Sequence, residues 1–399
     1  MKRQVHVAGA GVLSAIGNTV SETFQALQNQ QSGIGALTLF DSIHQSTLPV
    51  GEVKLSSEEL QERAKSLHPL PRTALLGIVA AREALVSSGI KNITDWRNGL
   101  LSCTTVGGMD KTERFFVDFT KDNKRGRLRN VIDHECGRST ESIAEALGVN
   151  GFLSTINTAC SSSVNSIIFG ARLIENDLAD VIIAGGTDAL TKFTLNGFNS
   201  LLILDKSPSR PFDASRNGLN LGEGAGYLVL VSDKVLKQES LTSLATIAGF
   251  GNTNDAFHQT ASSPEGRGSF GAMEKALAMS GLAPSSIGYI NLHGTGTVNN
   301  DLSEGTAIKR LFAEKIPRFS STKAYTGHTL GASGGIEAVF SLLALQHQCV
   351  FPNLRFQTPI PELNMIPQTT FEFAPINHVM SNSFGFGGNC SSIIISKNR

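Results

Sequence analysis

The chain has 399 residues, of which 40% are apolar and 17% are charged, so it can build two core-forming units and is not disordered. Lysine plus arginine equals aspartate plus glutamate at 34 each, which argues against bulk binding to nucleic acid or to an anionic membrane. The five cysteines are odd in number and form no CxxC pair, which indicates neither a zinc knuckle nor a disulfide framework. Reduced thiols in a cytoplasmic protein are the simplest interpretation.

The first apolar run, residues 5–17, follows two basic residues and imitates a signal peptide. His6, Gly9 and Gly11 interrupt this run, so a buried first strand explains it better. The same glycines suggest a dinucleotide fingerprint, but Ser14 stands where the third glycine belongs. No segment reaches the roughly 20 apolar residues that a bilayer crossing needs, so no membrane partner is expected.

Short β-rich runs alternate with helical patterns along the chain, which predicts an α/β protein with largely parallel sheets. Strands are expected at residues 4–11, 98–108, 152–159, 180–189, 226–232, 244–253, 287–295, 318–323 and 390–397. Helices with one apolar face are expected at residues 72–90, 162–177, 271–282 and 335–348. Charge rises after a strand at residues 232–243, so we expect two α/β halves, 1–240 and 241–399.

Cys160 lies between the end of a predicted strand at Ala159 and the start of a predicted helix. A thiol at the positive end of a helix dipole is expected to have a lowered pKa. Backbone N–H groups of the same turn can stabilise an oxyanion. The alternative for an isolated cysteine is a buried structural role.

Two histidines follow predicted strands of the second half. His293 precedes a Gly/Thr-rich turn at the carboxyl end of its strand, the edge where α/β sheets bind ligands. Lys323 and His328 share a loop of small residues and can point into one cavity, where a neutral imidazole donates to a thioester oxygen. A core histidine and a surface lysine in a helix-entry loop are the alternatives.

Residues 381–389, SNSFGFGGN, alternate phenylalanine with glycine. Such a segment suits a flexible gate or an oxyanion contact. An ordinary turn before the last strand explains it equally well.

These four segments, in this order and spacing, resemble the β-ketoacyl synthase family of the thiolase superfamily. Residues 7–35 and 209–230 match the family as well, so the resemblance covers essentially the whole chain. It implies a thiolase-like fold of duplicated halves, layered α-β-α-β-α, with the active site at their junction. It also implies decarboxylative condensation of acyl chains, without a metal or a bound cofactor.

The resemblance assigns roles residue by residue. Cys160 accepts the acyl group, and His293 and His328 donate hydrogen bonds to the malonyl thioester carbonyl. The N–H groups of Cys160 and Phe386 form the oxyanion hole, and Phe386 with Gly387 forms a gate that faces Asp255. Lys323 organises the site, with Glu337, Asp301 and Glu304 as its candidate partners. Thr295 and Thr297 contact the pantetheine arm. Two histidines, rather than His and Asn, favour elongation of carrier-bound chains.

The implied partner is an acyl carrier protein that presents acyl and malonyl groups on phosphopantetheine. A homodimer or a heterodimer with a chain length factor is expected, with residues 152–159 near the two-fold axis and the partner's residues 131–136 lining the acyl tunnel. The basic residues of segment 121–129 are candidates for steering the acidic carrier, although a solvated loop is the usual explanation of such a run: Lys124, Arg125, Arg127 and Arg129.

Some segments depart from the housekeeping enzymes of the family. Asn389 and Cys390 stand where many relatives have Thr-Asn, and the roles of Cys136 and Cys390 stay open. Residues 119–148 and 185–201 resemble the ketosynthases of bacterial aryl-polyene and flexirubin-type pigment clusters, which implies an unsaturated or aryl-primed chain.

Two rival functions remain. Residues 331–335 fit the GxSxG pattern of a serine hydrolase, with Ser333 as the nucleophile. A catalytically silent subunit like a chain length factor would keep the fold but lack the nucleophile. The presence of Cys160, His293 and His328 in one chain speaks against that subunit.

Overall fold

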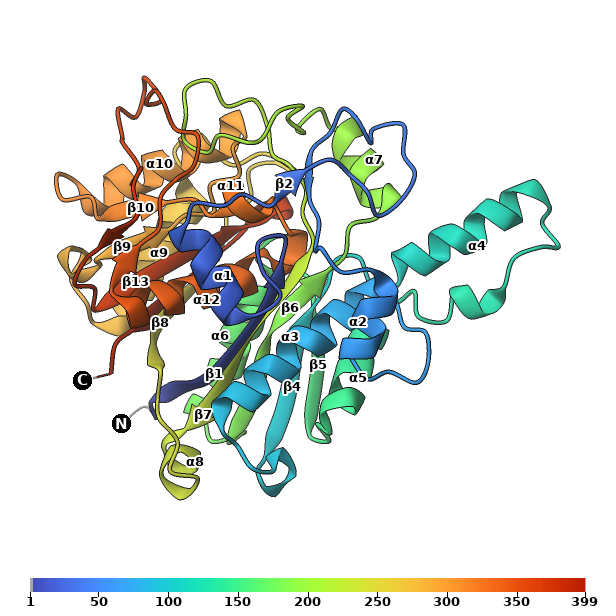
Figure 1. Cartoon of the computed structure of the whole chain (residues 1–399). Helices are drawn as coiled ribbons and strands as arrows, with labels where there is room; N and C mark the ends of the chain where they lie inside the picture. The colour runs from blue at the N-terminus through green and yellow to red at the C-terminus, as the bar shows by residue number, and fades with distance from the viewer. Residues whose placement is uncertain (1–2, 399) are drawn as a thin grey trace.

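The computed structural model describes residues 3–398, and ten of its strands form one mixed sheet (Figure 1). Their order is β10-β9-β13-β14-β8-β1-β7-β6-β4-β5. The ten strands are β1 (Val5–Ser14), β4 (Asn98–Cys103), β5 (Phe152–Ile156), β6 (Val181–Asp188), β7 (Gly224–Ser232), β8 (Ala245–Asn254), β9 (Tyr289–Asn291), β10 (Arg318–Ser320), β13 (His378–Phe384) and β14 (Asn389–Ser396). Two small ribbons pair β2 (Ile34–Gly35) with β3 (Val50–Gly51) and β11 (Cys349–Val350) with β12 (Glu372–Phe373).

The sheet consists of two halves with the same pairing pattern. In the first half β5, β4 and β6 are parallel, and β7 and β1 follow antiparallel. In the second half β10, β9 and β13 are parallel, and β14 and β8 follow antiparallel. Only the pairs His6–Thr246 and Val7–Ala245 join β1 to β8. The duplicated α/β fold expected from the sequence is therefore confirmed. The expectation of largely parallel sheets is wrong, because five of the nine strand pairings in this sheet are antiparallel and four are parallel. The division at residue 240 stays a prediction.

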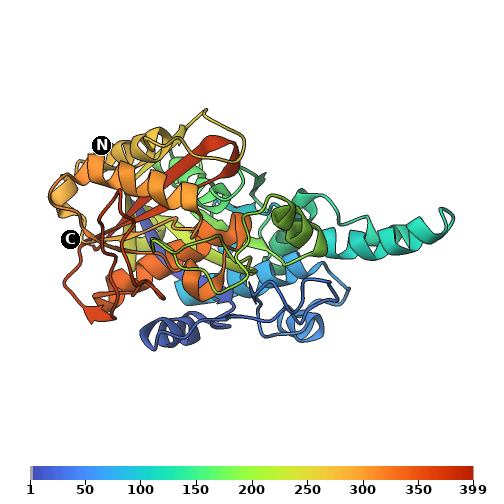
Figure 2. The same cartoon turned by 90° about the horizontal axis from the view of Figure 1, so that it is seen from above.

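Helices separate the two half-sheets and cover their outer faces (Figures 1 and 2). The inner helices α6 (Ser162–Glu175) and α12 (Ser333–His347) share one hydrophobic core with strands of both halves. The outer cores lie under α3 (Arg72–Ser88) with α5 (Cys136–Leu147) and under α9 (Arg267–Ser280) with α10 (Val298–Phe312). Helix α12 is buried along nearly its whole length, as expected for a helix that is apolar all round.

Six further helices and five 3₁₀ turns complete the described residues. They are α1 (Val20–Gln28), α2 (Ser57–Arg63), α4 (Met109–Lys121), α7 (Lys192–Ser200), α8 (Asp233–Gln238) and α11 (Lys323–Thr326), with 3₁₀ turns at η1 (Ile93–Asp95), η2 (Leu128–Asn130), η3 (Pro284–Ser286), η4 (Leu330–Ala332) and η5 (Phe386–Gly388). Within residues 3–398, no helix combines the length and apolar character that a bilayer crossing requires.

Helix α4 and η2 form an arm that projects from the body of the molecule (Figures 1 and 2). No residue of α4 is buried, and large apolar side chains on the arm are exposed, including Phe116, Val117, Leu128 and Ile132. Apolar surface of this extent marks an interaction site.

The sequence patterns missed the central strand β13, which pairs with β9 and β14. The strand carries Ser381, Asn382 and Ser383, all fully buried, and these polar residues hide the apolar signal of a core strand. Helix α10 was missed for the same reason, since Asp301 and Glu304 lie on its buried face. The buried polar side chains of β13 and α10 therefore indicate that a functional site lies in the interior beside these two elements.

Candidate active site

The thiol of Cys160 stands in a strained turn between β5 and α6. Ala159 has a φ of 56°, in the left-handed region that residues with a side chain avoid. The hydroxyls of Ser161 and Ser162 donate to the carbonyls of Thr158 and Ala159 and close the turn. Cys160 is buried and lies two residues before the start of α6. The chain therefore bends sharply at the residue that carries the thiol.

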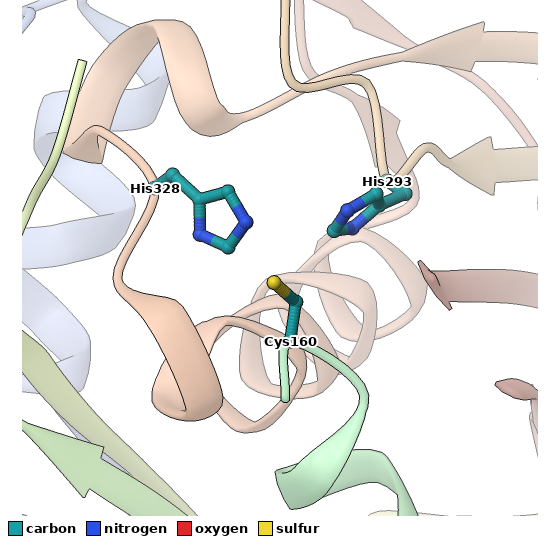
Figure 3. A group of neighbouring side chains, drawn as sticks. All are labelled: Cys160, His293 and His328. Carbon is teal, nitrogen blue, oxygen red and sulfur yellow. The ribbon is translucent and has the colours of Figure 1, made fainter. Parts of the chain in front are cut away.

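The fold brings Cys160, His293 and His328 together (Figure 3). His293 follows β9, and His328 lies between α11 and η4. The sulfur and one ring nitrogen of each histidine all lie within 4.8 Å of one another, and all three side chains are buried. The two rings meet edge to face with centroids 5.5 Å apart, and the thiol points toward the space between them.

The δ nitrogens of both imidazoles are occupied. Nδ1 of His328 accepts from the N–H of Leu330 at 3.0 Å, and Nδ1 of His293 lies 3.3 Å from Nζ of Lys323, which can only donate. A neutral imidazole has one donor and one acceptor nitrogen, so Nε2 carries the hydrogen in both rings. Both rings can therefore donate to a third group.

Burial keeps the two imidazoles neutral. Burial is the first cause that holds the pKa of His293 well below its usual value, and the positive charge of Lys323 is the next cause. Burial, then the charge of Lys323, lowers the pKa of His328 in the same way. Neutral rings place hydrogen-bond donors beside the thiol without adding positive charge.

The three candidate partners of Lys323 have different roles. Lys323 pairs with Glu337 of α12, and both side chains are buried. The carboxylate of Glu304 instead accepts from the N–H groups of His293 (2.9 Å) and Gly294 (2.8 Å). The prediction that Glu304 pairs with Lys323 is therefore wrong, because the start of the His293 turn already occupies its oxygens.

Asp301 is also engaged elsewhere. Its carboxylate accepts from the N–H groups of Phe212 (2.8 Å) and Gly296 (3.2 Å), with Arg216 at 3.9 Å. The prediction that it pairs with Lys323 is wrong as well. Both acidic residues of α10 hold backbone turns in place.

The thiol differs from the sequence expectation in its acidity. Burial raises the pKa of Cys160 to about 11, while the charge of Lys323 and the N–H of Phe386 oppose the rise. The expected lowering at the helix start is thus outweighed by the loss of water around the sulfur. The N–H groups of Phe386 and Cys160 both face the sulfur, which places the two expected oxyanion donors together.

The expected gate lies at the end of β13. The ring of Phe386 stacks on Phe198 of α7 with centroids 5.9 Å apart. Gly387 has a φ of 77°, a conformation that a side chain would strain. The N–H of Asp255 donates to the carbonyl of Gly388 at 2.8 Å, so the segment around Asp255 does face the gate.

The carboxylate of Asp255 points away from the gate. It accepts from the N–H and hydroxyl of Ser263 and from the N–H of Gly268. Asp255 therefore contacts the gate through its backbone, while its side chain stabilises its own loop.

Asn389 closes a polar network behind the gate. Its side-chain oxygen accepts from Ser161 (2.8 Å) beside the nucleophile, from Asn165 (2.9 Å) of α6 and from Asn252 (2.9 Å) of β8. Asn389, which stands where the resemblance would place a threonine, therefore connects the gate to helix α6 by hydrogen bonds.

A cavity of about 400 Å³ leads from the surface to the three residues. Cys160, His293 and His328 line its inner end, and Thr295 and Thr297 line its wall with their hydroxyls 2.9 Å apart. The hydroxyls and the gate thus border the path that a substrate must follow to the thiol.

Asp188, at the end of β6, is a buried carboxylate that the sequence analysis missed. It accepts from the hydroxyls of Thr104 and Thr105, from the N–H of Thr105 (2.8 Å) and from the N–H of Gly331 (2.7 Å). Burial raises its pKa to about 6. An acidic residue directly after an apolar strand was the available signal.

Asp188 acts on the site through the turn η4. It fixes Gly331, whose carbonyl accepts from Ser163 of α6 at 2.7 Å, and the preceding residue Leu330 donates to His328. The carboxylate therefore anchors the turn that orients one imidazole against the nucleophile helix.

Ser333 does not occupy a hydrolase site. Its hydroxyl is buried against Nδ1 of His328 and Oγ1 of Thr329, both at 3.1 Å, outside the residues that line the cavity. It begins α12 after Ala332 in ordinary helical geometry, so the sharp nucleophile turn belongs to Cys160. The serine hydrolase alternative is not favoured.

The four basic residues proposed for docking lie on the exposed outer part of the arm, after α4: Lys124, Arg125, Arg127 and Arg129. Arg125 forms an ion pair with Asp122 at 3.3 Å. The segment that carries them belongs to the projecting arm (Figure 1), and none of the four lines the cavity of its own chain.

A buried thiol between two neutral imidazoles, at the junction of duplicated α/β halves, defines a condensing enzyme of the thiolase type. Residues 2–235 match the family model for the beta-ketoacyl synthase N-terminal domain, and residues 244–357 match that for its C-terminal domain. The chain belongs to the β-ketoacyl synthase family. It is a condensing acyltransferase, a β-ketoacyl-acyl carrier protein synthase.

Curated relatives and solved structures agree with this assignment. The chain is 35% identical over 408 residues to 3-oxoacyl-acyl-carrier-protein synthase 2 of Staphylococcus aureus (strain N315), covering 99% of this chain and 98% of the relative. The synthase 2 of Coxiella burnetii is 33% identical, covering 99% of both chains. A chain of the ishigamide ketosynthase/chain length factor superposes with a TM-score of 0.93 at 28% identity over 100% of both chains. A ketosynthase in complex with its chain length factor, from Xenorhabdus doucetiae, gives 0.86 at 31% identity, covering 99% of this chain and 98% of that one.

Proposed function

We propose that Cys160 accepts the growing acyl chain and that His293 and His328 activate the malonyl extender. The observation that carries this proposal is the group of three, with all reacting atoms within 4.8 Å and both Nδ1 atoms occupied. Two Nε2–H donors beside one thiol suit an enolate oxygen next to an acyl-cysteine.

In the first step, the sulfur of Cys160 attacks the carbonyl of an acyl thioester on the carrier. The N–H groups of Cys160 and Phe386 stabilise the oxyanion. The bond to the carrier sulfur breaks, and the carrier leaves as a thiol with the proton that Cys160 loses. The product is acyl-Cys160.

In the second step, a malonyl thioester binds with its carbonyl between His293 and His328. Carbon dioxide leaves, and the two Nε2–H groups stabilise the enolate. The enolate carbon attacks acyl-Cys160, the carbon–sulfur bond breaks, and the thiolate of Cys160 takes up one proton. The carrier keeps a β-ketoacyl chain that is two carbons longer.

Other residues of the cavity support these steps. Lys323, held by Glu337, fixes the acceptor role of Nδ1 in His293. Thr295 and Thr297 contact the pantetheine arm along the cavity wall, and Phe386 with Gly387 opens the inner end. The small, apolar and hydroxyl-bearing lining supports an uncharged, extended arm as the occupant.

The partners follow from the same chemistry. One solved relative, a type II polyketide ketosynthase, is in complex with its acyl carrier protein, and another is in complex with its chain length factor. For this chain we propose an acyl carrier protein and a second chain, either a copy or a chain length factor. The exposed edge strand β5 and the apolar arm offer surface for that second chain, and the partner's residues 131–136 would line the acyl tunnel.

The finer assignments belong to the same proposal. The substrate is a polyene or aryl-primed chain, supported by the resemblance of residues 119–148 and 185–201. The basic end of the arm attracts the acidic carrier over a distance. Five free cysteines agree with a cytoplasmic enzyme.

The test is intact-protein mass spectrometry after incubation with acyl-loaded carrier protein. Wild type is expected to gain one acyl mass, Cys160→Ala none, and the control Cys136→Ala the same mass as wild type. The acyl group that loads best defines the substrate class. A folded wild type that accepts no acyl group would overturn the proposal and point to a silent subunit.

A further inference from the structure

The three reacting side chains have the ligand set of a zinc site. Cysteine sulfur and histidine nitrogen are ligands that Zn²⁺ prefers, and three protein ligands with an open fourth position are typical of its catalytic sites. The ligand atoms of Cys160, His293 and His328 lie within 4.8 Å of one another. Tetrahedral Zn²⁺ holds such atoms about 3.3–3.6 Å apart. Small side-chain shifts would therefore bring all three onto one ion.

A metal ion would also have access to these side chains. The cavity of about 400 Å³ leads from the surface to all three, and none of the described residues that line it is a lysine or an arginine. Neither a closed path nor a cationic lining therefore keeps Zn²⁺ out. A bound ion would occupy the thiol and both Nε2 atoms, so the site needs another form of protection.

The hydrogen bonds behind the two rings are the reverse of those in a metal site. A metal-bound histidine keeps a hydrogen on its other ring nitrogen and donates it to a carboxylate, a carbonyl or water. Here Nδ1 of His328 faces the N–H of Leu330 at 3.0 Å, and Nδ1 of His293 faces the ammonium of Lys323 at 3.3 Å. Both neighbours donate and neither can accept. Binding a metal through Nε2 would move each ring hydrogen to Nδ1 and set donor against donor.

Only one other neighbour of these nitrogens, the hydroxyl of Ser333, can adapt to such a change. It lies 3.1 Å from Nδ1 of His328 and can rotate to accept a hydrogen bond. The N–H of Leu330 cannot rotate, because Leu330 begins the turn η4 that Asp188 anchors through Gly331. The donor behind His328 therefore keeps its direction.

We propose that the N–H of Leu330 and the ammonium of Lys323 exclude Zn²⁺ and other thiolate-binding metal ions from the active site. Both groups act through the imidazoles, which makes Lys323 a positioning residue. They keep a hydrogen on the Nε2 atoms that a metal ion would need as lone-pair donors. The thiol of Cys160 thus stays free in a cavity that is open to metal ions. This inference goes beyond the proposed acyl transfer.

The experiment uses Co²⁺ as the probe, because its bond to a thiolate gives a charge-transfer absorption band. The variant Lys323→Gln/Glu337→Gln replaces the ammonium by an amide whose oxygen can accept from Nδ1–H of His293. Its affinity for Co²⁺ is expected to exceed that of wild type about 10–100-fold, the effect of a correct partner behind a metal-bound histidine. Adding Cys160→Ala should abolish the band, which separates this thiol from the other four cysteines.

A matched control separates the hydrogen bond from the charge. Lys323→Met/Glu337→Gln removes the same charges and the same donor but supplies no acceptor. It is expected to bind Co²⁺ less tightly than the glutamine variant. Equal affinity of the two variants would overturn the proposed role of the hydrogen bond.

Two further results would overturn the proposal. The first is a folded Lys323→Gln/Glu337→Gln protein, as shown by urea unfolding, that binds Co²⁺ no better than wild type. The second needs no variant: equimolar Zn²⁺ is expected to leave the alkylation of wild-type Cys160 by iodoacetamide unchanged, and protection of the thiol would contradict the exclusion. Neither measurement uses an acyl substrate, so the result is independent of the proposed function.

Discussion

The N–H of Leu330 donates to Nδ1 of His328 at 3.0 Å and thereby decides which ring nitrogen carries the hydrogen. Lys323 of α11 orients His293 in the same way, through Nδ1 at 3.3 Å. The two contacts come from different elements but have one result, a pair of Nε2–H donors beside Cys160 (Figure 3).

Replacing His328 by alanine should separate the two steps of the reaction. Loss of one donor to the enolate is expected to lower malonyl decarboxylation about 10²–10³-fold, while acyl transfer to Cys160 continues. Carbon dioxide release and the acyl mass on the protein measure the two steps. His68→Ala, at an exposed position, is the control. A similar loss in both steps would assign His328 a wider role.

The reactivity of the thiol should depend strongly on pH. Burial raises the pKa of Cys160 to about 11, so the thiolate is the minor form at neutral pH. Its alkylation by iodoacetamide should therefore become about tenfold faster for each pH unit between 7 and 9. Cys160→Ala gives the background from the other thiols. If the rate stops rising below pH 8, the pKa of Cys160 is lowered, as its position before the helix predicts.

Removing the charge of Lys323 should raise the pKa of His293. That charge is the second cause, after burial, of the lowered pKa of His293. Without it the pKa rises toward its usual value, so His293 is expected to protonate at higher pH in the variant Lys323→Met/Glu337→Gln than in wild type. NMR titration of ¹⁵N-labelled histidine from pH 5 to 8 measures this change. An unchanged titration of His293 would mean that Lys323 does not influence its pKa.

The same pair should control stability. Lys323→Met alone leaves Glu337 buried without its partner, and the free energy of unfolding is expected to fall by about 3–5 kcal/mol. Adding Glu337→Gln should recover part of this loss, as measured by urea unfolding. Equal stability of the single and double variants would show that the buried charge is hydrated.

Asp188→Asn should act through His328. The amide keeps the shape of the carboxylate but cannot accept from every donor around it, so η4 loosens and His328 loses its fixed orientation. Condensation is expected to fall about tenfold or more, and ¹⁵N NMR of labelled histidines should show a mixed His328 tautomer. Asp213→Asn is the matched control, since Asp213 is a buried carboxylate that accepts from the N–H groups of Gln357 and Thr358 outside the cavity. A purely structural role predicts the same effect for both variants.

Much of the fold was accessible from the sequence because apolar runs report burial directly. The runs at residues 180–189 and 226–232 correspond to β6 and β7, and the patterns at 72–90 and 335–348 correspond to α3 and α12. The same logic fails for β13, where the buried side chain of Asn382 accepts from the hydroxyl of Ser392 and donates to Glu304. Local sequence cannot show that a polar group has a buried partner.

The candidate residues Cys160, His293 and His328 were also found from sequence, because each follows a strand and precedes a helix at one edge of the sheet. Their distances, the partner of Lys323 and the position of Asp188 depend on segments far apart in the chain. The acidity of the thiol depends on them too, since its environment comes from α12, the gate and the opposite half. Sequence thus determined the elements and the chemical groups at their ends. Only the tertiary structure decided which groups meet, because desolvation and hydrogen bonding are set by neighbours that folding brings together.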